Sequence, residues 1–157
     1  MSNQGQSGQK EQYAQVVKDF LRFLEEKNIP ALIDLWADDG INYYPYSSGM
    51  SLEKVVGKQA ISETWKGVPE LFENLRFPLH AIYTDVTKQT AIVRFEAHNI
   101  MKGGAGRYDN TYVCIFVFND EGKIKEYHEY FNPILTGVTY GLLRIEFLQG
   151  EETQQSQ

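Results

Sequence analysis

The sequence predicts an α+β domain in which helices cover one face of a curved antiparallel sheet. Apolar side chains recur at helical spacing in roughly the first third of the 157 residues. From about residue 75 the pattern changes to strict alternation, which is typical of half-buried strands. Helices followed by strands, without a sequence repeat, are characteristic of this class. At 42% hydrophobic residues, the chain is able to build one core of its own.

Three helices are expected before the long strands. The first spans residues 12–27, where apolar side chains share one face opposite Glu, Lys and Arg. The second begins near Pro30, whose missing N–H costs nothing in a first turn, and it ends in residues 37–40. The third covers residues 57–66 with Trp65 facing inward, and one further turn is expected over residues 70–75.

The strands are expected in a regular succession. A short strand over residues 41–46 precedes a loose loop, Ser47 to Met50. Three long strands are predicted, and a turn after the third leads to a last strand. Their predicted ranges are 75–85, 90–101 and 107–119, followed by the turn at 120–123 and the last strand over 124–131. The glycine-rich residues 102–106 supply the turn between the second and third long strands.

Composition excludes several classes of function. The formal net charge is −6 and the Lys and Arg residues are scattered, which argues against nucleic acid and anionic membrane surfaces as partners. No apolar run approaches the ~18 residues of a membrane span. With no secretory signal and one cysteine, Cys114, the expected location is the cytoplasm. Cys114 itself is expected to be a small core residue rather than a nucleophile.

The domain is expected to occupy residues 11–148. The polar residues 1–10 and 149–157 are predicted to be disordered tails.

Polar side chains sit among the aromatic residues of the last two strands. Tyrosine hydroxyls, the Asn110 amide and the Glu129 carboxylate fall on or near the face that should be apolar. A sheet that faced only a core would rarely accept them, because each buried polar group needs a partner. The sequence therefore predicts that this face forms the wall of a ligand cavity.

Three segments, in this order and spacing, resemble the SnoaL-like, ketosteroid-isomerase-related branch of the nuclear transport factor 2 (NTF2-like) superfamily. They are Leu35-Trp36-Ala37-Asp38-Asp39-Gly40, Gly57-Lys58-Gln59-Ala60-Ile61, and Gly122-Lys123-Ile124 with Glu129-Tyr130-Phe131-Asn132-Pro133. The resemblance covers nearly everything between the two tails. It implies a cone-shaped NTF2-like (cystatin-like) fold, in which a curved antiparallel sheet wraps three N-terminal helices around a hydrophobic cavity. It also implies homodimers that form through the outer face of the sheet.

The resemblance is weaker for the chemistry. Where ketosteroid isomerases carry an Asp base before a proline, this chain has Tyr44, and their oxyanion-hole tyrosine matches Phe20. The C-terminal half is similar to the phenazine biosynthesis A/B proteins, whose proposed acid-base Glu matches Glu129. Their histidine and arginine correspond to Thr64 and Leu32. One of three catalytic positions is thus retained, so the resemblance does not carry over that condensation reaction.

Glu129 is the predicted catalytic residue. Tyr127 and Phe131, two positions away on either side, share its face of the strand, so its carboxyl would be partly desolvated. Desolvation raises the pKa of a carboxyl and suits it to acid-base work near neutral pH. The alternative is a glutamate at the sheet rim that pairs with an arginine or a backbone amide. A register slip of one residue would turn His128 inward in its place.

Seven further residues are expected to bind the substrate, a small apolar or aromatic molecule. Polar contacts are predicted from the tyrosines beside Pro45 and from the strand that precedes Glu129, and apolar walls from the helix side and the last strand. The residues are Tyr44, Tyr46, Trp65, Phe72, Asn110, Tyr112 and Phe131. Tyr112 should lie opposite or diagonal to Glu129. Cross-strand aromatic packing is the alternative for Tyr112, and core packing is the alternative for Trp65 and Phe72.

Neither a metal nor a cofactor is predicted. His80, His98 and His128 lie on three different strands and lack the spacing of metal ligands. Arg94, Glu96 and His98 alternate against apolar neighbours and should face outward, as should His128.

These features leave three hypotheses open. The first is a cofactor-independent enzyme of isomerase, cyclase or hydrolase type that uses Glu129 for general acid-base chemistry. The second is a non-catalytic protein that binds an apolar ligand in the same cavity. The third is a dimeric assembly module that acts through the outer sheet face, where changes at Arg94, Glu96 or His128 would alter association. Fold alone does not choose among them.

Overall fold

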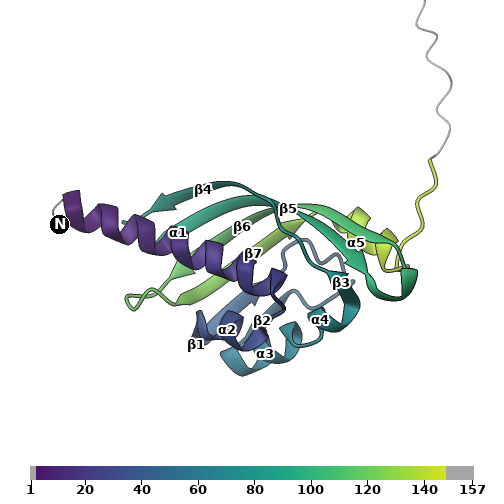
Figure 1. Cartoon of the computed structure of the whole chain (residues 1–157), viewed down its shortest axis with the longest axis horizontal. Coiled ribbons are helices and arrows are strands. Elements are labelled where there is room, and N and C mark those ends of the chain that lie inside the picture. Colours follow the sequence, from purple (N-terminus) through teal and green to yellow (C-terminus); the bar gives the residue numbers. More distant parts are fainter. Residues whose placement is uncertain (1–2, 148–157) are drawn as a thin grey trace, which may run out of the picture.

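The computed structural model describes residues 3–147 and shows helices packed on the concave face of one curved sheet (Figure 1). The helices are α1 (Asn3–Glu25), α2 (Ile29–Asp34), α3 (Lys58–Trp65), α4 (Val68–Leu71), α5 (Pro133–Thr139) and the 3-10 turn η1 (Lys102–Gly104). The strands are β1 (Trp36–Tyr43), β2 (Lys54–Val56), β3 (Phe72–Asn74), β4 (Leu79–Asp85), β5 (Thr90–Met101), β6 (Arg107–Phe118) and β7 (Ile124–Phe131). The predicted α+β class with N-terminal helices on a curved sheet is confirmed.

The sheet is mixed rather than purely antiparallel. Its seven strands follow the order β2-β1-β7-β6-β5-β3, and β4 also pairs with β5. The strands β1 and β7 run parallel, with Asn42 beside Tyr127 and Tyr43 beside His128, whereas the other pairs are antiparallel. Sequential hairpins cannot produce a parallel pair, and the connection from β1 to β7 runs through most of the domain. The alternation pattern alone therefore could not reveal this pair.

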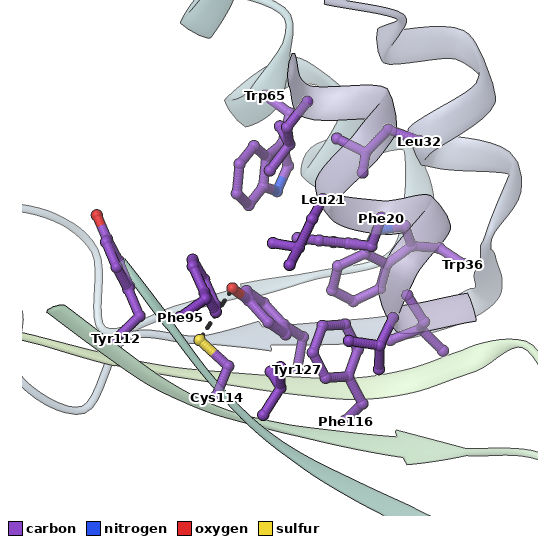
Figure 2. Packing of buried hydrophobic residues seen from close by; sticks show 14 of the residues in the cluster. Phe20, Leu21, Leu32, Trp36, Trp65, Phe95, Tyr112, Cys114, Phe116 and Tyr127 are labelled. Carbon is purple, nitrogen blue, oxygen red and sulfur yellow. Dashed lines mark hydrogen bonds between the residues drawn. The ribbon is translucent and has the colours of Figure 1, made fainter. Parts of the chain in front are cut away.

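Helix α1 supplies one side of the core. Phe20 is fully buried and its ring meets those of Phe116, Tyr127 and Trp65 at centroid distances of 5.2, 5.0 and 5.7 Å. Figure 2 shows this cluster between the helices and the inner face of the sheet. At the other end of α1, Tyr13 stacks on Phe118, with 4.3 Å between the ring centroids. The aromatic residues thus fill the space between α1 and the sheet.

The second helix ends earlier than the sequence pattern predicts. Residues 37–40 were expected to close it, but they lie in β1, which begins at Trp36. Position 40 of this strand has no room for a side chain, because an added Cβ at Gly40 would lie 2.9 Å from the Trp36 ring and 3.0 Å from the Ala37 carbonyl oxygen. The Trp36 backbone also pairs with Ile124 of β7. This pairing with a distant strand outweighs the local helical spacing.

Four other local differences separate the structure from the sequence prediction. The helical turn expected over residues 70–75 is shared between α4 and the strand β3, and the strand expected over 75–85 begins at Leu79. The three-residue strand β2 was not predicted. Helix α5 was not predicted either, although Asn132 and Pro133 are a cap and a first-turn proline. The Asn132 side chain accepts hydrogen bonds from the backbone N–H groups of Ile134 and Leu135.

At the N-terminus, residues 3–10 are helical where the sequence predicted a disordered tail. The Gln and Lys residues of this segment are good helix formers, and the helix runs on without a break from the buried turn around Tyr13. The amide of Gln9 donates a hydrogen bond of 2.9 Å to the Tyr13 hydroxyl. The tail predicted at residues 149–157 lies outside the described residues. None of the helices between residues 3 and 147 combines the length and the apolar character that crossing a bilayer requires.

Candidate functional site

A cavity of about 450 Å³ lies between the inner face of the sheet and the helices. Its volume is at the small end of the range of about 300–1,000 Å³ that is common for ligand sites. The strands β6 and β7 form its floor, and α3, α4 and the segment after α5 form its sides. Leu52 and Leu71 also line it and are 67% and 47% exposed, so they mark its mouth.

Apolar and aromatic side chains make up most of the walls. The predicted wall residues Trp65, Phe72 and Phe131 all line the cavity. Phe95, on β5, also belongs to the lining and stacks flat on Tyr112, with centroids 4.9 Å apart. A ligand in this cavity would therefore contact ring faces on several sides.

Glu129 supplies the cavity's carboxylate. Its backbone pairs with Cys114 on β6, whose side chain is fully buried on the inner face, so Glu129 also points inward. The side chain is half-buried, and since it lines the cavity, its accessible surface includes the cavity wall. Burial raises the pKa of Glu129 to about 7, and the Tyr127 hydroxyl opposes part of this rise. Near neutral pH this carboxyl can therefore both take up and release a proton.

The cavity holds no second charge among residues 3–147. Glu129 is its one acidic side chain, and no lysine, arginine or histidine lines it. Burial and the charge of Glu129 both raise the pKa of Tyr44, and desolvation is the larger cause. The same two causes raise the pKa of Tyr112 and of Tyr140, the latter to about 12. These hydroxyls are thus neutral hydrogen-bond donors or acceptors at physiological pH.

A chain of hydrogen bonds ends at the Tyr112 hydroxyl. The Asn110 amide donates to the Tyr108 oxygen at 3.0 Å, and the Tyr108 and Tyr112 oxygens are 2.7 Å apart. When Tyr108 donates to Tyr112, the hydrogen of Tyr112 is left to point at a ligand. Tyr112 lies diagonal to Glu129, because it pairs with Phe131 while Glu129 pairs with Cys114. The predicted arrangement of Tyr112 and Glu129 is therefore present.

Asn42 links the strand side of the cavity to the helix side. Its Oδ1 accepts a hydrogen bond from the Tyr44 hydroxyl at 3.1 Å and another from the Trp65 indole N–H at 3.2 Å. Tyr44 lines the cavity, as predicted, and its oxygen can still accept a hydrogen bond from a ligand. Sequence reasoning missed Asn42, although an amide on the inward face of a strand was a signal that a buried partner existed.

Two predicted contact residues do not line the cavity. Tyr46 is 52% exposed, and its ring packs edge-on against Tyr130. Strand alternation placed it with Tyr44, but β1 ends at Tyr43 and a turn closes with a hydrogen bond from Ser47 N–H to the Tyr44 carbonyl. Alternation does not continue through a turn.

Asn110 lies behind the cavity wall. Its Oδ1 accepts from the backbone N–H groups of Asn132 and Thr111, and its Nδ2 lies 3.1 Å from the Asn132 carbonyl oxygen. Asn110 thus fixes the start of α5. That helix brings Thr136 and then Tyr140 to the cavity, two lining residues that the sequence reasoning missed. The Asn-Pro pair before α5 was the signal that could have indicated them.

The histidines lie away from the cavity. His98 Nε2 is 2.9 Å from Glu96, on the outer face that the alternation of these two residues predicts, and His80 Nε2 is 3.2 Å from the same carboxylate. His128 stacks on Tyr43 and bonds to Glu126, so Glu129 rather than His128 faces the cavity. Among residues 3–147, no three His, Cys, Asp or Glu side chains are grouped so as to hold a metal ion.

The buried carboxyl has a cost in stability that depends on pH. The pKa of Glu129 is about 7 in the folded chain and near its ordinary 4.5 after unfolding, so between these values only the folded chain holds the proton. Stability therefore falls as pH rises through this window and stays low above it.

Glu129→Gln removes this titration. We compare the free energy of unfolding of Glu129→Gln with that of the unmutated chain at the same pH. The difference in favour of Glu129→Gln should be about 3 kcal/mol larger at pH 8 than at pH 4. Urea unfolding followed by circular dichroism measures it. Glu126→Gln, on the outer face, is the matched control and should show no such growth. An equal gain at both pH values would contradict a raised pKa.

The chain belongs to the SnoaL-like family, since residues 17–127 match its model for a SnoaL-like domain. A curated relative is the uncharacterized protein YesE of Bacillus subtilis (strain 168). It is 24% identical over 143 residues, which cover 91% of this chain and 95% of the relative. The predicted similarity to phenazine biosynthesis proteins stays a prediction.

Solved structures share the NTF2-like fold. A Bacillus subtilis protein provisionally described as an isomerase superposes with a TM-score of 0.79 at 24% identity, over 90% of this chain and 99% of its own. A ketosteroid-isomerase-like protein from Catenulispora acidiphila DSM 44928, in complex with trimethylamine, gives 0.67 at 16% identity, over 82% and 93%. An LEH-like epoxide hydrolase of M. tuberculosis gives 0.66 at 16% identity, over 84% and 92%. At these identities the likeness shows the fold.

Proposed function

We propose that this SnoaL-like protein is an enzyme of isomerase, cyclase or hydrolase type that moves a proton on a small, largely apolar molecule. The observation that carries the proposal is Glu129, a carboxyl whose pKa of about 7 suits proton transfer in an apolar cavity. Two solved structures of the same fold, one described as an isomerase and one as an epoxide hydrolase, support the proposal. Both reaction types can use a carboxyl group whose pKa is raised to about 7 for proton transfer.

The remaining polar groups fit supporting roles in such a reaction. Glu129 takes the proton, and the Tyr112 hydroxyl, polarised by Tyr108 and Asn110 behind it, donates to the oxygen on which negative charge develops. Trp65, Phe72 and Phe131 hold the apolar body of the substrate and keep water away. In the isomerase and cyclase types every proton then moves between the substrate and side chains of this chain, whereas the hydrolase type takes one water molecule as its second substrate.

Proton exchange tests the proposal without knowledge of the substrate. Small apolar ketones, incubated with the protein in D₂O, should exchange their α-protons, which NMR detects. Because the carboxylate form abstracts the proton, the rate should rise with pH, with a midpoint at about 7, and then level off.

A panel of small apolar epoxides, followed by NMR for ring opening, covers the hydrolase type. If the protein accelerates neither reaction while the same compounds bind in the cavity, the chain is a binding protein rather than an enzyme.

We further propose that the protein forms a homodimer through the outer face of the sheet. A row of apolar side chains crosses this face, because Tyr83 of β4 pairs with Ile92 of β5, which pairs with Ile115 of β6. Tyr83 is 65% exposed and Ile92 is 41% exposed, and a partner would remove both from water.

Ile92→Arg should convert the dimer to a monomer in light scattering, because it places a charge at the centre of this row. The control is Val56→Arg, on the exposed strand β2 away from the row, which should leave the dimer intact. A monomeric unmutated protein would contradict the proposal.

A further inference from the structure

The charge inside the cavity favours one class of ligand. Glu129 is the acidic side chain of the lining, and within residues 3–147 no basic side chain joins it there. An anionic ligand would be repelled without compensation, whereas a cation would find a counter-charge. The formal net charge of −6 for the whole chain adds to the attraction of cations.

The aromatic walls favour the same class. Phe72 and Tyr108 have ring centroids 6.1 Å apart with planes tilted by 50°, and Tyr108 and Tyr140 are 5.7 Å apart at 40°. Tyr112 and Phe131 are 6.3 Å apart at 45°. Rings tilted in this way form corners rather than flat stacks, so a ligand in a corner meets more than one ring. An ammonium group within about 6 Å of an aromatic face is attracted to it, and more strongly where water is excluded.

We propose that the cavity takes ligands with one tertiary or quaternary ammonium group on a small apolar body, held between the Glu129 carboxylate and the rings of Tyr108, Tyr112 and Phe131. This inference rests on the same cavity as the proposed enzyme and adds the chemical class of its ligand. The methyl groups of such a cation contact the rings, and its charge is offset by the carboxylate.

The pH dependence of binding follows from the groups that face Glu129. The tyrosines and the thiol around it all have a raised pKa, with burial as the largest cause, so they stay neutral between pH 6 and pH 8. They are Tyr44 after β1, Tyr108, Tyr112 and Cys114 on β6, Tyr127 on β7, and Tyr140 after α5. Glu129 is thus the group of this cavity that changes its charge in that range.

An isosteric pair of probes tests the inference. Choline and 3,3-dimethylbutan-1-ol have the same shape. They differ in one atom, which is a positively charged nitrogen in choline and a neutral carbon in the alcohol. In NMR titrations at pH 8, we expect the unmutated protein to bind choline at least tenfold more tightly than the alcohol. Since choline does not titrate, its affinity should fall about tenfold from pH 8 to pH 6, as Glu129 takes up a proton.

Two variants locate the effect. In Glu129→Gln the preference for choline should fall about tenfold, because the carboxylate is lost while the rings remain, and in the control Glu126→Gln it should stay as in the unmutated protein. The inference is overturned if the alcohol binds the unmutated protein as tightly as choline at pH 8. It is also overturned if the preference survives unchanged in Glu129→Gln.

The outcomes separate this inference from the proposed function. Exchange of ketone protons that depends on Glu129, without a preference for choline, would leave the enzyme proposal standing and remove the ligand class. A preference for choline without turnover of any ketone or epoxide would do the reverse.

Discussion

Glu129→Gln is expected to lower the rate of proton exchange by about 10²–10⁴-fold, which is the usual contribution of a positioned acid or base. Glutamine has nearly the same shape as glutamate but cannot accept the proton. No other carboxylate of residues 3–147 lines the cavity, so none can replace it. The measurement is the initial exchange rate of a ketone in D₂O, at a pH where the unmutated protein has reached its plateau.

The control for this loss is Glu126→Gln, which removes a carboxylate from the same strand but from the outer face. It should keep most of the activity. Binding of the ketone should also persist in Glu129→Gln, because the apolar walls are unchanged. If Glu129→Gln keeps more than a tenth of the activity, Glu129 is not the group that moves the proton, and the acid-base proposal fails.

Phe20→Ala should lower the free energy of unfolding by about 3–5 kcal/mol, the range for removal of a buried aromatic ring. Phe20 is fully buried, and its ring touches Phe116, Tyr127 and Trp65 from three directions. The rigid rings around it cannot close the space that alanine would leave. Urea unfolding followed by circular dichroism measures the loss.

The control for the core is Phe147→Ala, which removes the same side chain from a position that is 91% exposed. Its effect should stay within about 0.5 kcal/mol. A loss of less than about 1 kcal/mol in Phe20→Ala would show that the core between α1 and the sheet is loosely packed. The position that resembles the oxyanion-hole tyrosine of ketosteroid isomerases is thus a core position in this chain.

The long strands and the direction of Glu129 could be predicted from the sequence, for one physical reason. Successive side chains of a strand point to opposite faces, so once Cys114 and Tyr112 are buried, the register of β6 with β7 fixes Glu129 on the same face. The wall residues Trp65 and Phe131 followed from spacing in the same way.

The rest depends on contacts between segments that are distant in the chain. The role of Asn110 is set by Asn132, 22 residues away, and cannot be read from the alternation of β6 alone. Tyr140 reaches the cavity because α5 turns the chain back over the sheet. The parallel pairing of β1 with β7, which draws Trp36 out of the expected helix, is also a tertiary effect.

The Trp65 indole can report optically on the cavity, because it shares its hydrogen-bond acceptor, the side-chain oxygen of Asn42, with Tyr44. The chain has two tryptophans, and Trp36 does not line the cavity, whereas the indole of Trp65 does and donates to the oxygen that also binds the Tyr44 hydroxyl. A ligand that pulls Tyr44 away from Asn42 would change the polarity around this indole. Emission from Trp65 should therefore shift in wavelength when the site fills, and Trp36 should contribute a constant background.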